Sequence, residues 1–166
     1  MSEKAVAVVD TDVLLNLATP VVDGRPQAPS GVDPLKALLT GYDVQIPASV
    51  LGELTDATGS DDLLAAAADL VLQAANHLTT HDIDAQIDEP LDYGLDHGES
   101  ECIWLANELE ADLFITDEFS TTNYLFVTLA LDDRNTLFTT PHVLCTLAVH
   151  GILPVEYVES ARVTNR

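Results

Sequence analysis

Short apolar runs alternate with amphipathic stretches along the chain, which is the pattern of strands separated by helices. Residues 5–9 (AVAVV) are apolar at every position, as in a strand that is buried on both faces of a parallel sheet. Further strands are expected at 44–46, 112–116 and 136–139. Strands that alternate with helices predict an α/β fold, here three α/β/α layers around a central, mostly parallel sheet of four to five strands.

Helices are expected where apolar residues recur every three to four positions. Their expected ranges are 11–17, 34–40, a segment that begins at Pro47, 61–77, 99–109, 120–131 and 141–150. Pro20 should end the first helix, because proline lacks an amide hydrogen, and Ser60 is the expected N-cap of the long alanine-rich helix. Residues 79–90 are polar and predict a connector with little regular structure, and 155–163 predict an edge strand or hairpin arm.

The length of 166 residues and the hydrophobic share of 47% favour one domain with its own core, covering 1–166. The apolar run near the N-terminus is too short for a signal peptide or a membrane span, so we expect a cytoplasmic protein without membrane association. Cys102 and Cys145 lie in helical apolar patterns and are expected to be buried free thiols. Two cysteines without a CxxC spacing do not indicate a zinc site.

The charge balance is strongly acidic. Six Lys and Arg stand against 28 Asp and Glu, which gives a formal net charge of −22. Such charge destabilises a compact protein in dilute buffer, whereas molar salt shortens the Debye length to about 3 Å. Because the acidic residues are distributed and not gathered in one block, the composition indicates an organism with a very salty cytoplasm, of the halophilic archaeal type.

Acidic residues abound in this chain, so their position beside apolar runs is the informative property. Four places share it, and their residues are Asp10, Glu53, Glu99 with Glu101, and Asp117. The C-terminal ends of parallel strands and the helix turns beside them meet at one edge of an α/β sheet. Carboxylates that converge there repel one another unless a hard cation lies between them, and Mg²⁺ and Mn²⁺ prefer such oxygen ligands. The sequence therefore predicts a metal-dependent enzyme that acts on phosphate esters.

Four segments in this order resemble the PIN domain family, a Mg²⁺- or Mn²⁺-dependent nuclease fold. They are VVDTDVLL (8–15), VLGEL (50–54), GESECIWLA (98–106) and ADLFITDE (111–118). The resemblance extends from residue 5 to about 153, and it implies that Asp10 and Glu53 are the first two acidic site residues. The third is Glu99 or Glu101, and the fourth is Asp117 or Glu118.

The expected catalytic set is Asp10, Glu53, Glu99 and Asp117, with Glu101 as a further metal ligand. In a two-metal hydrolysis, ions about 3.5–4 Å apart clamp the attacking water and the leaving oxygen. Asp10 and Asp117, at strand ends, would be rigid inner ligands. The helical glutamates would ligate through water or orient the nucleophile.

The acidic residues, and the threonines next to two of them, also have structural interpretations that involve no metal. Thr11 and Thr116 are candidates for positioning a carboxylate or a substrate phosphate, and plain turn hydrogen bonding is the alternative. The alternative for Asp10 is a helix N-cap, which the other acidic places make the weaker interpretation. The alternative for one of Glu99 and Glu101 is a first-turn acid favoured by the helix dipole.

The resemblance implies single-stranded RNA as the substrate and, for many small members, the role of the toxin in a toxin–antitoxin pair. An antitoxin-like protein partner and a homodimer are expected on the same ground. The arginines are few and scattered, so metal bridging and shape would have to supply more of the RNA affinity than a basic patch. The second hypothesis is a catalytically inactive PIN-like module that acts in protein–protein interaction or regulation, in which the carboxylates fail to converge.

Overall fold

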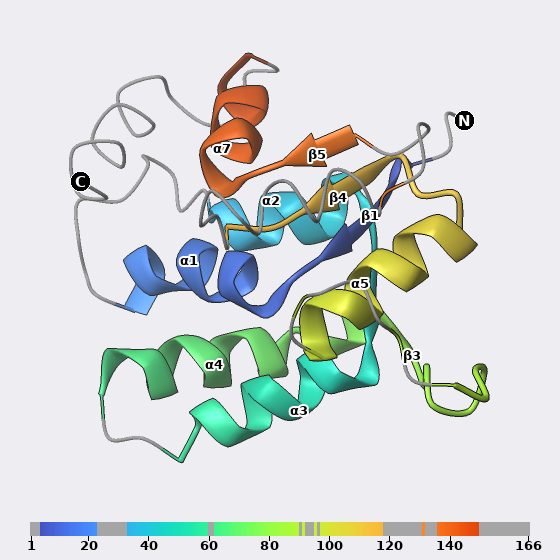
Figure 1. Ribbon diagram of the computed structural model, residues 1–166. Helices are drawn as coiled ribbons and strands as arrows, with labels where there is room; N and C mark the ends of the chain where they lie inside the picture. The colour runs from blue at the N-terminus through green and yellow to red at the C-terminus, as the bar shows by residue number, and fades with distance from the viewer. Residues whose placement is uncertain are drawn as a thin grey trace.

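Five parallel strands form the central sheet of the protein, for which the computed structural model describes residues 4–22, 33–59, 62–89, 91, 95, 97–117, 131 and 136–149 (Figure 1). The spatial order is β3-β2-β1-β4-β5 and every neighbouring pair is parallel. The strands are β1 (Val6–Val9), β2 (Asp43–Pro47), β3 (Leu78–His81), β4 (Leu113–Ile115) and β5 (Thr136–Phe138). The predicted α/β class with a central parallel sheet is confirmed.

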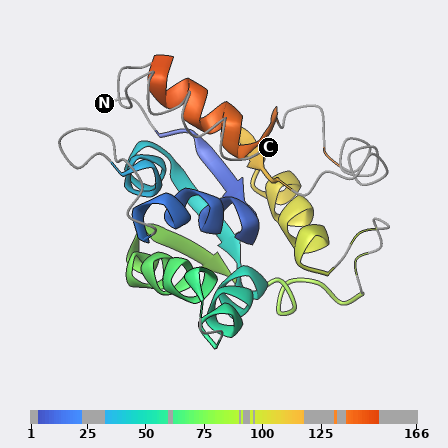
Figure 2. The ribbon, with the colours of Figure 1, turned by 90° about the vertical axis from the view of Figure 1, so that its left-hand side faces the viewer.

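Helices cover both faces of this sheet, which gives the three layers. They are α1 (Thr11–Val22), α2 (Pro34–Gly41), α3 (Ala48–Ala57), α4 (Leu63–Gln73), α5 (His97–Glu108) and α7 (Thr140–Val149), with a 3₁₀ turn, η2, at Ala75–His77. Figure 2 shows α5 on one face and α1, α2 and α4 on the other. No helix in these described ranges is long and apolar enough to cross a membrane.

The direction of strand addition reverses at β1. Chain order runs from β1 through β2 to β3 on one side, and β4 then returns to pair with the other side of β1. In open α/β sheets, ligand sites lie beyond the C-terminal ends of the strands at such a reversal. The two residues that follow these strands and flank this point are Asp10 after β1 and Asp117 two positions after β4.

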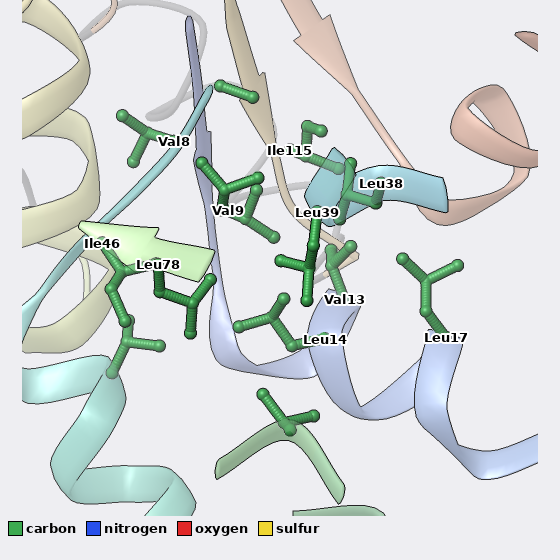
Figure 3. Packing of buried hydrophobic residues seen from close by; sticks show 14 of the residues in the cluster. Val8, Val9, Val13, Leu14, Leu17, Leu38, Leu39, Ile46, Leu78 and Ile115 are labelled. Carbon is green, nitrogen blue, oxygen red and sulfur yellow. The ribbon is translucent and has the colours of Figure 1, made fainter. Parts of the chain in front are cut away.

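The core is built on the three inner strands, β2, β1 and β4. Ala7, Val8 and Val9 of β1 have no exposed surface, as expected of a strand buried on both faces. Figure 3 shows Val9 among side chains from α1 and α2, including Leu14 and Leu38. The largest fully buried side chain is that of Phe114, in the middle of β4.

Three sequence predictions about secondary structure are wrong: the end of the first helix, the connector after residue 78 and the N-cap of α4. The first helix does not end before Pro20 but continues to Val22. Pro20 lies in the last turn, where its missing amide hydrogen costs one intrahelical bond, and the burial of Leu17 and Ala18 holds the preceding turn against the core.

The polar segment that predicted a connector contains a strand. β3 (Leu78–His81) pairs in parallel with β2 along its whole length, and only Leu78 of its four residues is buried. A strand at the sheet edge needs little apolar character because one side of it faces solvent, and the local sequence therefore gave a weak signal.

Helix limits differ from the prediction at α4. Its N-cap is Asp62, whose carboxylate accepts hydrogen bonds from the amides of Leu64 and Ala65, and not Ser60. The helix stops at Gln73 and the chain then makes the η2 turn. The predicted edge strand over 155–163 and, apart from Leu131, the predicted helix over 120–131 lie outside the described residues.

Phe114 offers a test of the core. We expect Phe114→Ala to lower the free energy of unfolding by about 3–5 kcal/mol, because it removes a fully buried ring from the central sheet. Urea denaturation in molar KCl measures this change. Leu64→Ala is the control, since 45% of the Leu64 side chain is already exposed and its loss should cost far less. Equal losses in the two variants would contradict the described core.

Candidate metal centre

Asp10 begins the candidate site, directly after the end of β1. Its amide donates to the carbonyl of Ile115 at 3.0 Å, which continues the pairing of β1 with β4 and sets Asp10 beside Thr116. The hydroxyl of Thr116 donates to one carboxylate oxygen of Asp10 at 3.3 Å, and the amide of Thr11 donates to the other at 2.7 Å. The Asp10 side chain is 5% exposed. Strand pairing and two hydrogen bonds thus fix this carboxylate at the sheet edge.

Glu53 reaches the same edge from α3. Its carboxylate accepts a hydrogen bond of 2.6 Å from the hydroxyl of Thr11, the first residue of α1. Thr11 is buried, whereas Glu53 is exposed. Thr11 therefore joins α3 to the start of α1. It donates hydrogen bonds to both Asp10 and Glu53, and the Glu53 side chain remains exposed to solvent.

The first turn of α5 supplies two more acidic residues. It is buried except at His97, its first residue. Gly98, Glu99, Ser100 and Glu101 are all buried, although three of them are polar. Both carboxylate oxygens of Glu99 are shielded from solvent. Burying a carboxylate is costly unless a partner compensates for the lost hydration, and Glu101 has such a partner in His97.

Cys102 marks the point around which these residues gather. Burial raises the pKa of its thiol well above the ordinary value, and the negative charges of Asp10, Glu53, Glu101 and Glu99 raise it further. Carboxylates from β1, α3 and α5 therefore lie within electrostatic reach of one sulfur atom. The sequence predicted Cys102 as a buried free thiol, which is confirmed, and it gave no sign that the thiol would lie amid the acidic residues.

Asp117 lies at the same sheet edge but is held from another side. One carboxylate oxygen accepts from the amide of Thr140 at 2.7 Å. The other accepts from the side-chain amide of Asn16 at 2.7 Å and from the hydroxyl of Thr140. Asp117 thus bridges the start of α7 and the first half of α1. Glu118, the alternative fourth residue, is outside the described residues.

Glu99 and Glu101, which the sequence left as alternatives for the third acidic site residue, have different surroundings in the structure. Glu101 is 3% exposed and its carboxylate lies 2.5 Å from Nε2 of His97, one turn earlier on α5. Burial raises the pKa of Glu101, the charge of His97 lowers it, and Asp84 and Asp82 raise it, with the net direction upward. Glu101 therefore faces the segment after β3, a neighbourhood that sequence analysis missed.

Thr11 and Thr116 both use their hydroxyls on carboxylates. Of the two roles considered from sequence, positioning a carboxylate is the one that the described hydrogen bonds display. Sequence analysis assigned no role to Asn16, Thr140, Asp84 or His97. Asn16 and Thr140 act on Asp117, which is distant from both in sequence, and Asp84 approaches His97 and Glu101 only in the folded chain.

The donor set suits a hard divalent cation. Carboxylate oxygens are the ligands that Mg²⁺ and Mn²⁺ take in proteins. Among the described residues, the group whose ligand atoms all lie within 4.8 Å of one another is Asp84, His97 and Glu101, so Asp10, Glu53 and Glu99 would have to move closer together to share an ion. Asp10 and Glu99 would hold the ion from the inside and Glu53 from the solvent side.

The raised pKa of Glu101 predicts a pH-dependent effect of Glu101→Gln. Because the folded-state pKa lies above the ordinary value of 4.5, the stabilising contribution of the neutral carboxyl is complete below that value and is lost as the pH rises through the folded-state pKa. The variant should therefore melt near the wild-type temperature at about pH 4 and above it at about pH 7. Thermal melts in metal-free molar KCl test this.

Glu108→Gln is the matched control, since Glu108 is an exposed glutamate on the same helix. It should show no gain between the two pH values. A Glu101→Gln variant less stable than wild type at neutral pH would contradict the assigned electrostatics.

Comparison with protein-family models, with curated proteins and with solved structures gave no match to this chain. What the protein does must therefore be inferred from the residues of the site and from their arrangement.

Proposed function

We propose that this chain is a Mg²⁺- or Mn²⁺-dependent endoribonuclease that hydrolyses phosphodiester bonds of single-stranded RNA, as the resemblance to PIN domains implies. The observation that carries the proposal is that Thr11 donates hydrogen bonds to the carboxylates of both Asp10 and Glu53. Asp10, Glu53 and Glu99 also all act electrostatically on the buried thiol of Cys102. They lie at the C-terminal edge of a parallel sheet, where the strand order reverses. This is the position in which open α/β folds place their ligands.

The metal is proposed on electrostatic grounds. Acidic side chains that are buried together destabilise one another, and a divalent cation converts that repulsion into attraction. Bound Mg²⁺ or Mn²⁺ supplies Lewis-acid stabilisation of the phosphate oxygens and a water molecule of lowered pKa. Metal binding should therefore stabilise the folded protein and also prepare it for hydrolysis.

The residues of the chain have distinct roles in this proposal. Asp10, fixed by Thr11 and Thr116, is the rigid anchor of the centre, and Glu99 supports it from the buried side. Glu53 is the exposed carboxylate, and it orients the attacking water and accepts its proton as the bond from phosphorus to the leaving oxygen breaks.

Asp117 completes the proposed set from the other side of the strand reversal. Its hydrogen bonds from Asn16 and Thr140 fix the direction of its carboxylate, in the way that outer residues orient metal ligands. Asn16 and Thr140 are positioning residues in this scheme.

The biological role and the assembly are further parts of the proposal. We infer a cytoplasmic toxin that an antitoxin-like protein restrains, and a homodimer. Of the apolar residues of α4, Ala67 and Val71 belong to the core. Leu63 and Leu64 are 37% and 45% exposed and are the ones available for a subunit contact.

The first test is cleavage of a labelled single-stranded RNA in molar KCl with Mn²⁺ or EDTA. Wild type should cut with Mn²⁺ only, and Asp10→Asn should lower the rate by at least about 100-fold, because the central ligand is lost. Glu108→Gln removes an exposed acid from α5 and should retain the wild-type rate. Cutting that Asp10→Asn retains would point to a contaminant or to a misplaced site.

The same variants decide between the nuclease and the inactive interaction module. Mn²⁺ should raise the melting temperature of wild type and of Glu108→Gln, and it should raise that of Asp10→Asn much less. Absence of both cleavage and Mn²⁺ stabilisation in wild type would favour a PIN-like module that acts in protein–protein interaction.

Thr116→Val tests the positioning of Asp10. The substitution keeps the shape of a fully buried side chain and removes the hydroxyl that donates to Asp10. We expect a loss of about 10–100-fold in Mn²⁺ affinity or cleavage rate. Thr55→Val is the control, because that hydroxyl donates to a backbone carbonyl on the exposed part of α3. Wild-type Mn²⁺ affinity and rate in Thr116→Val would remove Thr116 from the site.

A further inference from the structure

A second group of possible metal ligands lies beside the carboxylates just described. Asp84, His97 and Glu101 each offer one possible ligand atom, and these atoms all lie within 4.8 Å of one another. His97 and Glu101 are one turn apart on α5, and Asp84 follows β3. This group therefore joins the start of α5 to the segment that leaves the edge strand.

The spacing allows a coordination shell after side-chain adjustment. Ligand atoms about 2.0–2.2 Å from a tetrahedral Zn²⁺ lie roughly 3.3–3.6 Å apart, so the 2.5 Å contact between His97 and Glu101 must open and Asp84 must approach the ion. Asp84 and His97 are exposed and free to make this adjustment, while Glu101 is 3% exposed and held in place. One fixed ligand and two adjustable ones make the adjustment a matter of side-chain rotation.

The donor types select the kind of metal. An imidazole nitrogen with two carboxylates suits Zn²⁺ or Mn²⁺ better than Mg²⁺, which prefers oxygen alone. Three protein ligands also leave a coordination position open for water.

A simple ion pair between His97 and Glu101 is the competing explanation of their 2.5 Å contact. Even a protonated His97 leaves the three-residue group with a net negative charge, and Asp82 adds negative charge within electrostatic reach of Glu101. A divalent cation neutralises this excess, whereas a single imidazolium cannot.

We propose that Asp84, His97 and Glu101 form a binding site for Zn²⁺ or Mn²⁺, separate from the centre around Asp10, Glu53 and Glu99. A metal here clamps the segment after β3 to the first turn of α5 and thereby fixes the turn that carries Glu99. This proposal does not depend on nuclease activity, and a measurement of metal binding is sufficient to test it.

The experiment measures Zn²⁺ binding by equilibrium dialysis in molar KCl, which screens weak association with the acidic surface. The protein carries Asp10→Asn, so that the other centre is disabled. We expect about one tightly bound Zn²⁺ per chain, and at least about a tenfold loss of affinity on adding His97→Gln or Asp84→Asn. His77→Gln is the matched control, because His77 is exposed and precedes β3 at the opposite end of the strand.

A second readout identifies the histidine. Paramagnetic Co²⁺, used in place of Zn²⁺, should shift the NMR signals of one imidazole, assigned to His97 by their absence in His97→Gln. Equal Zn²⁺ affinity in the His97→Gln and His77→Gln proteins would overturn the proposal, as would Co²⁺ shifts on any histidine except His97. Failure of the nuclease proposal would look different, since it concerns the response of Asp10→Asn and of RNA cleavage.

Discussion

The parallel pairing of β1 with β4 is the constraint on which the candidate site depends. Both strands are short and their middle residues are buried, so their register is fixed by core packing. The amide of Asp10 continues this pairing by one more bond, to the carbonyl of Ile115. Shifting the register by one residue would move Val9 to the opposite, differently packed face of the sheet and carry Asp10 away from Thr116. The position of the acidic edge is therefore a consequence of how the apolar strands pack.

Threonine hydroxyls orient the carboxylates at this edge. Thr11 donates to Glu53, Thr116 to Asp10 and Thr140 to Asp117. A hydroxyl fixes the direction of a carboxylate without cancelling its charge, whereas a lysine or arginine would neutralise it. In a chain with only six basic residues, these neutral donors preserve the negative potential that would attract a cation.

The first turn of α5 carries two glutamates whose side chains have different surroundings. Residues two apart on a helix do not share a face, so Glu99 and Glu101 have different surroundings although both affect Cys102. Glu101 faces His97 and Asp84, while Glu99 is enclosed by the core. A rigid buried turn between two acidic groups allows an ion in one to influence the geometry of the other.

The sequence by itself determined the layers, the inner strands and the places where acidic residues adjoin them, because burial on both faces produces continuous apolar runs that are visible locally. It did not determine β3, whose polar residues become a strand only through pairing with β2, where His81 also contacts Gln45 at 2.6 Å. Nor could it decide that α1 continues past Pro20, or that Asp84 meets His97 across a connector. These outcomes depend on contacts between segments distant in the chain, and only the packed structure sets the energies of such contacts.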